Sequence, residues 1–171
     1  DTYFEERRNF FLENTTLFDS PVDLFYSRRI GENPLYESKG DEQLKEALVL
    51  GATKIAGKTK SNISYGFISA MTLSKGRKDS PMSINLNQPT HHYAVGRLSK
   101  DILSGNSYFG VTGTAFENYS GTSWALSYDG LYYLLDNNLF LDSQIIYSHT
   151  NNSGHGFGSF LEFEYSIPNL L

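Results

Sequence analysis

The sequence predicts an all-β fold: a partial, membrane-type β-barrel of about seven or eight antiparallel up-and-down strands. Two observations predict it. Aromatic residues make up 15% of the 171 residues, with 12 Tyr and 12 Phe, and Gly accounts for another 15 residues. Aromatic rings pack well on a pleated sheet, and glycine marks its bulges and bends. Long stretches also alternate apolar and polar side chains with a period of two, which is the period of a strand.

The strands are located by this alternation. It is clearest at 62–74, 139–149 and 156–166; in the first stretch the odd positions from Ile63 to Leu73 are mostly apolar, whereas the even positions are mostly small or polar. The other strands are expected at 24–30, 51–60, 91–102, 107–117 and 123–135. Strands of roughly ten residues are long enough to cross a bilayer at a tilt.

The chain divides at residue 40. Residues 1–40 contain Pro21 and Pro34 and show no sustained period, which predicts irregular structure around the short strand at 24–30. Residues 41–171 carry the barrel strands. The expected connections are a turn entering a strand at 41–50, a polar loop at 75–90, and tight turns at 103–106 and 136–138.

The same alternation fits a soluble sandwich or a lipocalin-like ligand-binding barrel, in which the apolar face points inward. Strand length and aromatic content favour the membrane barrel, in which that face points outward to lipid and polar side chains line the lumen. Aromatic residues near the expected strand ends would then lie at the membrane interfaces; these are Tyr93, Trp124, Tyr147 and Tyr165.

Composition excludes several classes of protein. The net charge of -5 argues against a nucleic-acid partner, because nucleic-acid binding needs a positive field. Without cysteine the chain has no disulfide and no cysteine-bound zinc. No apolar run approaches the roughly 18 residues of a membrane-spanning helix. The chain begins at Asp1 without a methionine or a signal peptide, so we expect a fragment or a processed product.

Charged residues are the candidates for a site in a lumen. Those near the amino end would either grip an anionic solute or form an ion-pair network that ties this segment to the barrel wall, and the structural role is favoured. Those on the polar faces of strands would tune the selectivity of a pore or simply hydrate its wall. The first group is Arg7, Arg8, Glu13, Arg28 and Arg29; the second is Lys54, Lys58, Asp129, Glu162 and Glu164.

The sequence offers no group of residues typical of an active site, and we expect the chain not to be an enzyme. Glu162 and Glu164 have roughly the separation of a glycosidase acid–base pair, but no substrate cleft is expected beside them. The four histidines lack the spacing of a metal site, and no serine lies in a G-x-S-x-G turn. We therefore expect no metal and no cofactor.

Two stretches near the amino end are similar to a known family. ERRNFFLE at 6–13, followed by Leu17-Phe18, and FYSRRIG at 25–31 resemble the ERRPFFLEG…LF…FYSRRIG signature of the DUF5916 family. Asn9 and Asn14 depart from the proline and glycine of that signature, and these changes affect only local turns. The resemblance extends in order over most of the chain, through GATKIAGK at 51–58 and YAVGRL at 93–98.

The resemblance implies a β-barrel of the bacterial outer membrane, in Bacteroidetes and related bacteria, that follows an amino-terminal sugar-binding domain of the family-9 type. The family barrel is larger, so this piece is not expected to close alone. The leading hypothesis is a fragment of an outer-membrane barrel, embedded in the lipid bilayer, that handles or transports a solute. A saccharide is suggested only by the companion domain, which these residues do not include. The alternatives are part of a carbohydrate-active, glycoside hydrolase-like cell-surface protein and the soluble lipocalin-like barrel.

Overall fold

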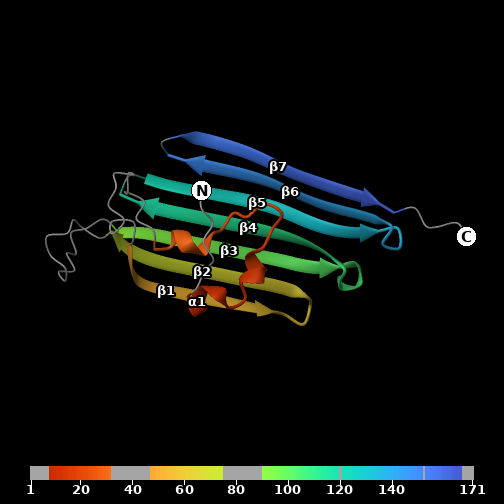
Figure 1. Ribbon diagram of the computed structural model, residues 1–171, viewed down its shortest axis with the longest axis horizontal. Helices are drawn as coiled ribbons and strands as arrows, with labels where there is room; N and C mark the ends of the chain where they lie inside the picture. The colour runs from red at the N-terminus through yellow and green to blue at the C-terminus, as the bar shows by residue number, and fades with distance from the viewer. Residues whose placement is uncertain (1–7, 32–46, 75–89, 120, 152, 167–171) are drawn as a thin grey trace, which may run out of the picture.

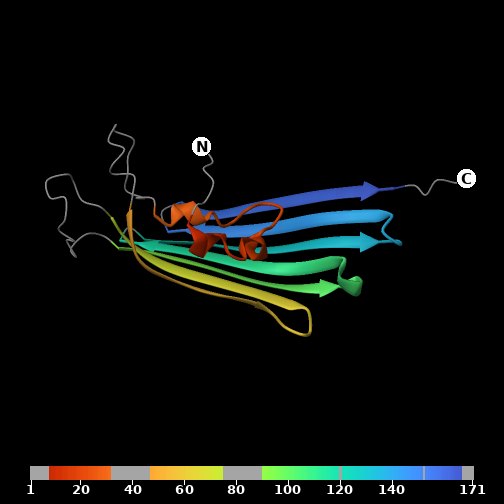
Figure 2. The ribbon, with the colours of Figure 1, turned by 60° about the horizontal axis from the view of Figure 1, so that its bottom comes forward.

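The computed structural model describes residues 8–31, 47–74, 90–119, 121–151 and 153–166. They form one sheet of seven antiparallel strands in sequence order, and an amino-terminal segment lies on one face of it (Figure 1 and Figure 2). The all-β, up-and-down prediction is confirmed, and the sheet is open, with β1 and β7 at its edges. The strands are β1 (Ala47–Lys58), β2 (Ile63–Ser74), β3 (Thr90–Ile102), β4 (Ser107–Asn118), β5 (Gly121–Leu134), β6 (Leu139–Thr150) and β7 (Gly154–Tyr165).

Seven of the eight predicted strands are present, and the strand predicted at 24–30 is wrong. Its place is taken by a 3-10 turn, η2 (Ser27–Arg29), followed by a single bridge residue, Ile30. The Arg8 guanidinium donates hydrogen bonds to the carbonyl oxygens of Ser27 and Ile30, at 3.0 and 2.5 Å. These tertiary contacts hold the backbone in a turn, so the apolar residues before it lie against the sheet without pairing as a strand.

Tight turns join the strands at one end of the sheet. The predicted turn at 103–106 contains η4 (Leu103–Gly105), and the predicted turn at 136–138 holds Asp136 and Asn137 at positive φ. Asp and Asn tolerate this left-handed conformation better than most residues. The expected loop at 75–90, except for Thr90, and the first part of the expected turn at 41–50 lie outside the described residues.

The two faces of the sheet differ in polarity. We call the face covered by the amino-terminal segment the inner face and the opposite one the outer face. Large apolar side chains on the outer face are exposed on every strand; they include Ile55, Phe67, Leu98, Val111, Leu126, Tyr128, Ile145, Phe157, Leu161 and Phe163. Polar side chains are buried on the inner face, namely Thr72, His91, Arg97, Thr112, Ser127, Asp129 and Gln144. The sheet therefore buries polar groups and exposes apolar ones.

Three of the four aromatic residues expected near the membrane interfaces lie on the outer face. Trp124 and Tyr147 are neighbours at one end of the sheet, with ring centroids 5.6 Å apart, and Tyr165 lies at the opposite end. The expectation for Tyr93 was wrong. Tyr93 pairs with Ala70 and lies on the inner face, where it packs against the core. Its position in the period of β3 turns it inward.

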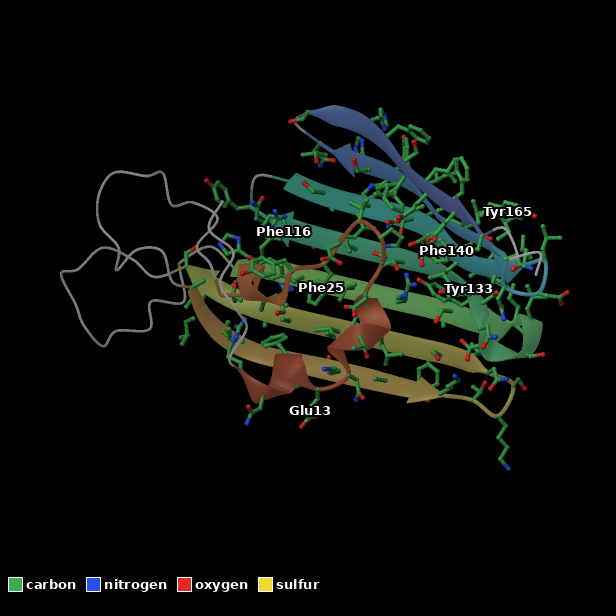
Figure 3. The ribbon with its side chains drawn as sticks, turned by 45° about the vertical axis from the view of Figure 1, so that its right-hand side comes forward. Glu13, Phe25, Phe116, Tyr133, Phe140 and Tyr165 are labelled. Atoms are coloured by element: carbon green, nitrogen blue, oxygen red, sulfur yellow. The ribbon has the colours of Figure 1, made fainter. Side chains whose placement is uncertain are left out.

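The amino-terminal segment supplies half of a small apolar core. It contains α1 (Asn9–Leu12) and η1 (Thr15–Phe18) before η2. No helix among the described residues is long and apolar enough to span a membrane. Figure 3 shows the segment lying over the sheet, with Glu13 and Phe25 of the segment labelled. The core consists of Phe11, Phe18 and Ile30 from the segment and of Ile68, Ala70 and Val95 from β2 and β3.

A glycine in β2 admits one of these core side chains. The Phe18 ring lies directly on Gly66, where an added Cβ would come within 2.8 Å of the ring. Gly96 offers a matched comparison in the next strand, since an added Cβ would meet Phe67 at an ordinary 3.6 Å.

We predict that Gly66→Ala destabilises the protein by about 1–2 kcal/mol, because the Phe18 ring must move out of its site. Gly96→Ala should be neutral or stabilising by up to about 1 kcal/mol, because alanine costs less backbone entropy on folding. Denaturant unfolding of the two variants tests this. Equal stability of the two would show that Phe18 does not depend on Gly66.

Candidate functional site

A buried ion pair lies at the centre of the inner face. Arg97 on β3 donates hydrogen bonds to both carboxylate oxygens of Asp129 on β5, at 2.6 and 2.5 Å. On β4, which lies between them, the Thr112 hydroxyl accepts another from Arg97 at 2.6 Å. Gly110 makes room for the guanidinium, because an added Cβ there would lie 2.8 Å from it. The two-point geometry ties three strands together and satisfies both charges, which are 5% and 0% exposed.

Gln144 on β6 holds the amino-terminal segment through a single backbone residue. Its Oε1 accepts a hydrogen bond from the Val22 amide at 2.6 Å, and its Nε2 donates to the Val22 carbonyl at 3.1 Å. The Nε2 group also lies 3.4 Å from the Ser20 hydroxyl. Burial and the neighbouring Asp23 carboxylate raise the pKa of Asp19, an effect that Arg97 partly offsets. The segment thus reaches from β2 across the inner face to β6.

Lys54 on β1 holds the other end of the segment. Its Nζ donates to the carbonyl oxygens of Phe10, at 3.1 Å, and of Glu13. These carbonyls lie at the end of α1, where they lack partners within so short a helix. Arg8 adds a cation–π contact, with its guanidinium 4.3 Å from the Phe11 ring centroid. The contacts that these two cations make with the segment include backbone carbonyls and a ring. For Arg8 the sequence suggested an ion-pair network, and for Lys54 a role in pore selectivity or in hydration of the wall.

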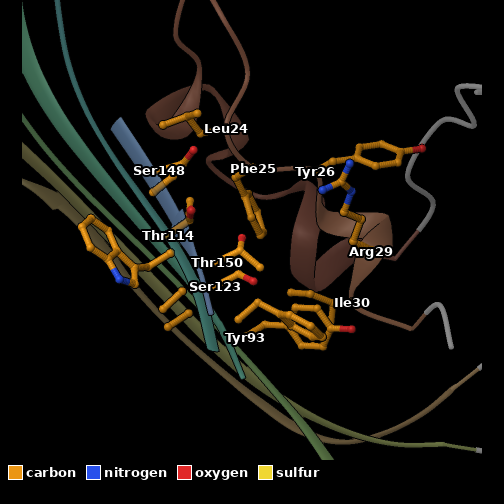
Figure 4. Close-up of a pocket in the computed structure, with 15 residues that line it drawn as sticks. Leu24, Phe25, Tyr26, Arg29, Ile30, Tyr93, Thr114, Ser123, Ser148 and Thr150 are labelled. Carbon is orange, nitrogen blue, oxygen red and sulfur yellow. The ribbon is translucent and has the colours of Figure 1, made fainter. Parts of the chain in front are cut away.

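A cavity of about 490 Å³ separates the amino-terminal segment from the inner face of the sheet (Figure 4). The segment contributes rings and one cation, and the sheet contributes hydroxyl groups and two further rings. On the β7 side of the cavity no side chain covers the wall, because the residues that pair with Thr150 and Ser148 are Gly154 and Gly156. The residues that define its chemistry are Phe25, Tyr26, Arg29, Tyr93, Phe116, Thr114, Ser123, Ser148 and Thr150.

Glu162 and Glu164 lie at the far end of the inner face. They line a second cavity of about 410 Å³ with Tyr133 and Phe140, whose ring centroids are 5.3 Å apart (Figure 3). The sequence suggested no substrate cleft beside these carboxylates, and the structure places an open hollow there. Both glutamates are exposed, since they lie on the edge strand β7, and Glu162 pairs with Asp142 of β6.

The remaining predicted residues are divided among several places. Lys58 shares the inner face with Lys54, as their spacing predicted, and forms an exposed ion pair with Asp101 at 2.5 Å. Arg29 is exposed and lines the first cavity. Glu13 is exposed and reaches Lys54 through its carbonyl. Arg7 and the Arg28 side chain lie outside the part of the chain that the structure describes.

The sequence did not single out Arg97 and Gln144. Both residues occupy inward positions of strands with a period of two. A charged or amide side chain that is buried needs a hydrogen-bonding partner, so these positions alone could have marked the two residues as candidates. Their partners are distant in sequence, so the pattern alone could not identify them. Among the described residues, no three His, Cys, Asp or Glu side chains lie close enough together to hold a metal ion.

We predict that Asp129→Asn costs about 3–5 kcal/mol of stability, because it leaves Arg97 buried and uncompensated. Lys58→Gln breaks an ion pair that is 52% and 24% exposed and should cost less than about 1 kcal/mol. Denaturant unfolding measures both, and Arg97→Met combined with Asp129→Leu should recover most of the loss. If Asp129→Asn were no worse than Lys58→Gln, the buried pair would not stabilise the inner face.

Comparison with known proteins agrees with the amino-terminal signature. The family model described as a domain of unknown function (DUF5916) matches residues 1–94. No curated protein and no solved structure matches the chain. Since the match covers more than half of the 171 residues, the chain belongs to the DUF5916 family.

Proposed function

We propose that the chain forms part of the wall of a β-barrel in a bacterial outer membrane, with the amino-terminal segment inside the lumen, and that the barrel handles or transports a solute. The inverted polarity of the sheet carries this proposal. Leu98, Phe157 and Phe163 are 60%, 74% and 71% exposed on the outer face, whereas Arg97, Asp129 and Gln144 are buried on the inner face. Lipid would cover the outer face, and a wet lumen suits the inner one.

The same observation weighs against a soluble lipocalin-like barrel, which would turn its apolar face inward. The hydrolase alternative is favoured less, because Glu162 and Glu164 are exposed on an edge strand, and the described residues that line the second cavity include no further acid. We therefore propose a role in binding or passage and not in catalysis.

We further propose a saccharide as the solute. The first cavity combines the rings of Phe25, Tyr93 and Phe116 with the hydroxyl groups of Ser123 and Thr150. Aromatic faces cover the apolar side of a sugar ring, and hydroxyl groups exchange hydrogen bonds with its edge. The cavity volume of about 490 Å³ lies within the range of small-molecule sites.

The first test of the membrane location is a charge on the outer face. Leu98→Lys should lower the stability of the membrane-inserted protein by about 2–4 kcal/mol, because a lysine near the bilayer centre loses hydration. In a water-soluble sheet the same change, at a side chain that is 60% exposed, should cost no more than about 0.5 kcal/mol. The inner-face variant Ser99→Lys is the control. The measurement is the yield of detergent-extracted, heat-modifiable protein; recovery of the parent protein as a soluble monomer would contradict the proposal.

The second test concerns the solute. Lipid vesicles that contain the full-length protein should take up a neutral disaccharide faster than protein-free vesicles. Phe116→Ala should weaken saccharide binding by about tenfold, because losing a partly buried ring costs roughly 1–2 kcal/mol. Phe163→Ala, on the outer face, should leave binding unchanged. Uptake of small ions without any uptake of saccharide would agree with the proposed barrel and would contradict the proposal that its solute is a saccharide.

A further inference from the structure

We infer that residues 19–26 form a strap that gates the first cavity and that Gln144 is its latch; the inference rests on the proposed function. The strap is held at both ends, because Phe18 and Ser27 are 6% and 9% exposed. No side chain between these two residues is buried. In Figure 1 this part of the segment loops out across the strands, away from the apolar core on β2 and β3.

The latch consists of hydrogen bonds that water can replace. One side-chain amide binds both backbone groups of Val22, at 2.6 and 3.1 Å, in the way that a neighbouring strand would. Val22 itself is 40% exposed, so its side chain adds little apolar burial. When the strap lifts, water can satisfy the Gln144 amide and the Val22 backbone, so opening has a small net cost.

Lifting the strap would change the cavity directly. Leu24, Phe25 and Tyr26 belong to the strap and form one wall of the cavity, and the opposite wall belongs to the sheet. The inner face of the sheet beneath the latch, beside the cavity, is polar, since Asp129 and Gln144 pair across β5 and β6 and are fully buried. A polar surface tolerates water, whereas an apolar one would resist opening. The strap can therefore open as a local unit while the core at Phe18 stays closed.

A reversible cross-link tests the gate. Val22→Cys and Gln144→Cys are introduced into the full-length protein. A direct disulfide would be too short, because the glutamine side chain fills the gap between the two backbones. A short bis-methanethiosulfonate reagent replaces that side chain and is removed by a reductant. The control links Ile145→Cys to Ser159→Cys, a cross-strand pair on the outer face.

Solute uptake into vesicles is measured with each linker present and after its removal. We expect the strap linker to slow uptake by at least about tenfold and the reductant to restore it, which corresponds to keeping a gate more than 90% closed. The control linker should have no effect. Uptake that is equally fast with and without the strap linker would overturn the inference.

Hydrogen exchange provides a measurement that does not depend on transport. The Val22 amide should exchange about 100-fold faster than the Ile146 amide in the sheet, and Gln144→Ala should accelerate it by a further fivefold or so. A Val22 amide that exchanges as slowly as Ile146 would show a fixed strap. If no vesicle takes up solute, the proposed transport function fails, and the exchange rates still decide whether the strap opens.

Discussion

The antiparallel register of the sheet is the constraint on which the other features depend. Each strand pairs with the next residue by residue, and the register shifts only between Val49 and Gly51 in β1 among the described strands. Because side chains alternate, a slip of one residue would turn a whole strand over and place its polar row on the outer face. The register therefore decides at once which side chains lie on the outer face and which on the inner face.

The register also places charged and polar side chains together on the inner face, where each of them needs a partner. It brings polar side chains from four neighbouring strands onto one face, where uncompensated charge would be costly. The pairing of Arg97 with Asp129 solves this within the sheet. The Gln144 side-chain amide finds its hydrogen-bonding partners in the backbone of the amino-terminal segment. The same residues that need partners thus fix where that segment lies.

Much of this fold could be predicted from period-two alternation, because the signal is local and repeats along each strand. Ile63 to Ser74 shows this well, with its outward and inward positions as the sequence placed them. The region around Ser27 could not be predicted, since Arg8, 19 residues away, decides its conformation. The candidate site was predicted in part. Asp129 was found from its place on a polar face, but its partner Arg97 was not, because a cross-strand diagonal depends on register. The cavities depend on how a segment without a period lies over the sheet, and no local pattern contains that information.

The two open edges of the sheet limit the number of strands with which a closed barrel could be completed. Neighbouring strands alternate in direction, so the first and the last of seven run the same way. Direct contact between these two edges would be a parallel pairing, whose slanted hydrogen bonds differ from every other pairing in the sheet. An entirely antiparallel closed cylinder that includes this sheet must therefore contain an odd number of additional strands between β7 and β1. Any such cylinder has an even total of strands, and Phe157 and Ile55, from the two present edge strands, would lie on the same side of its wall.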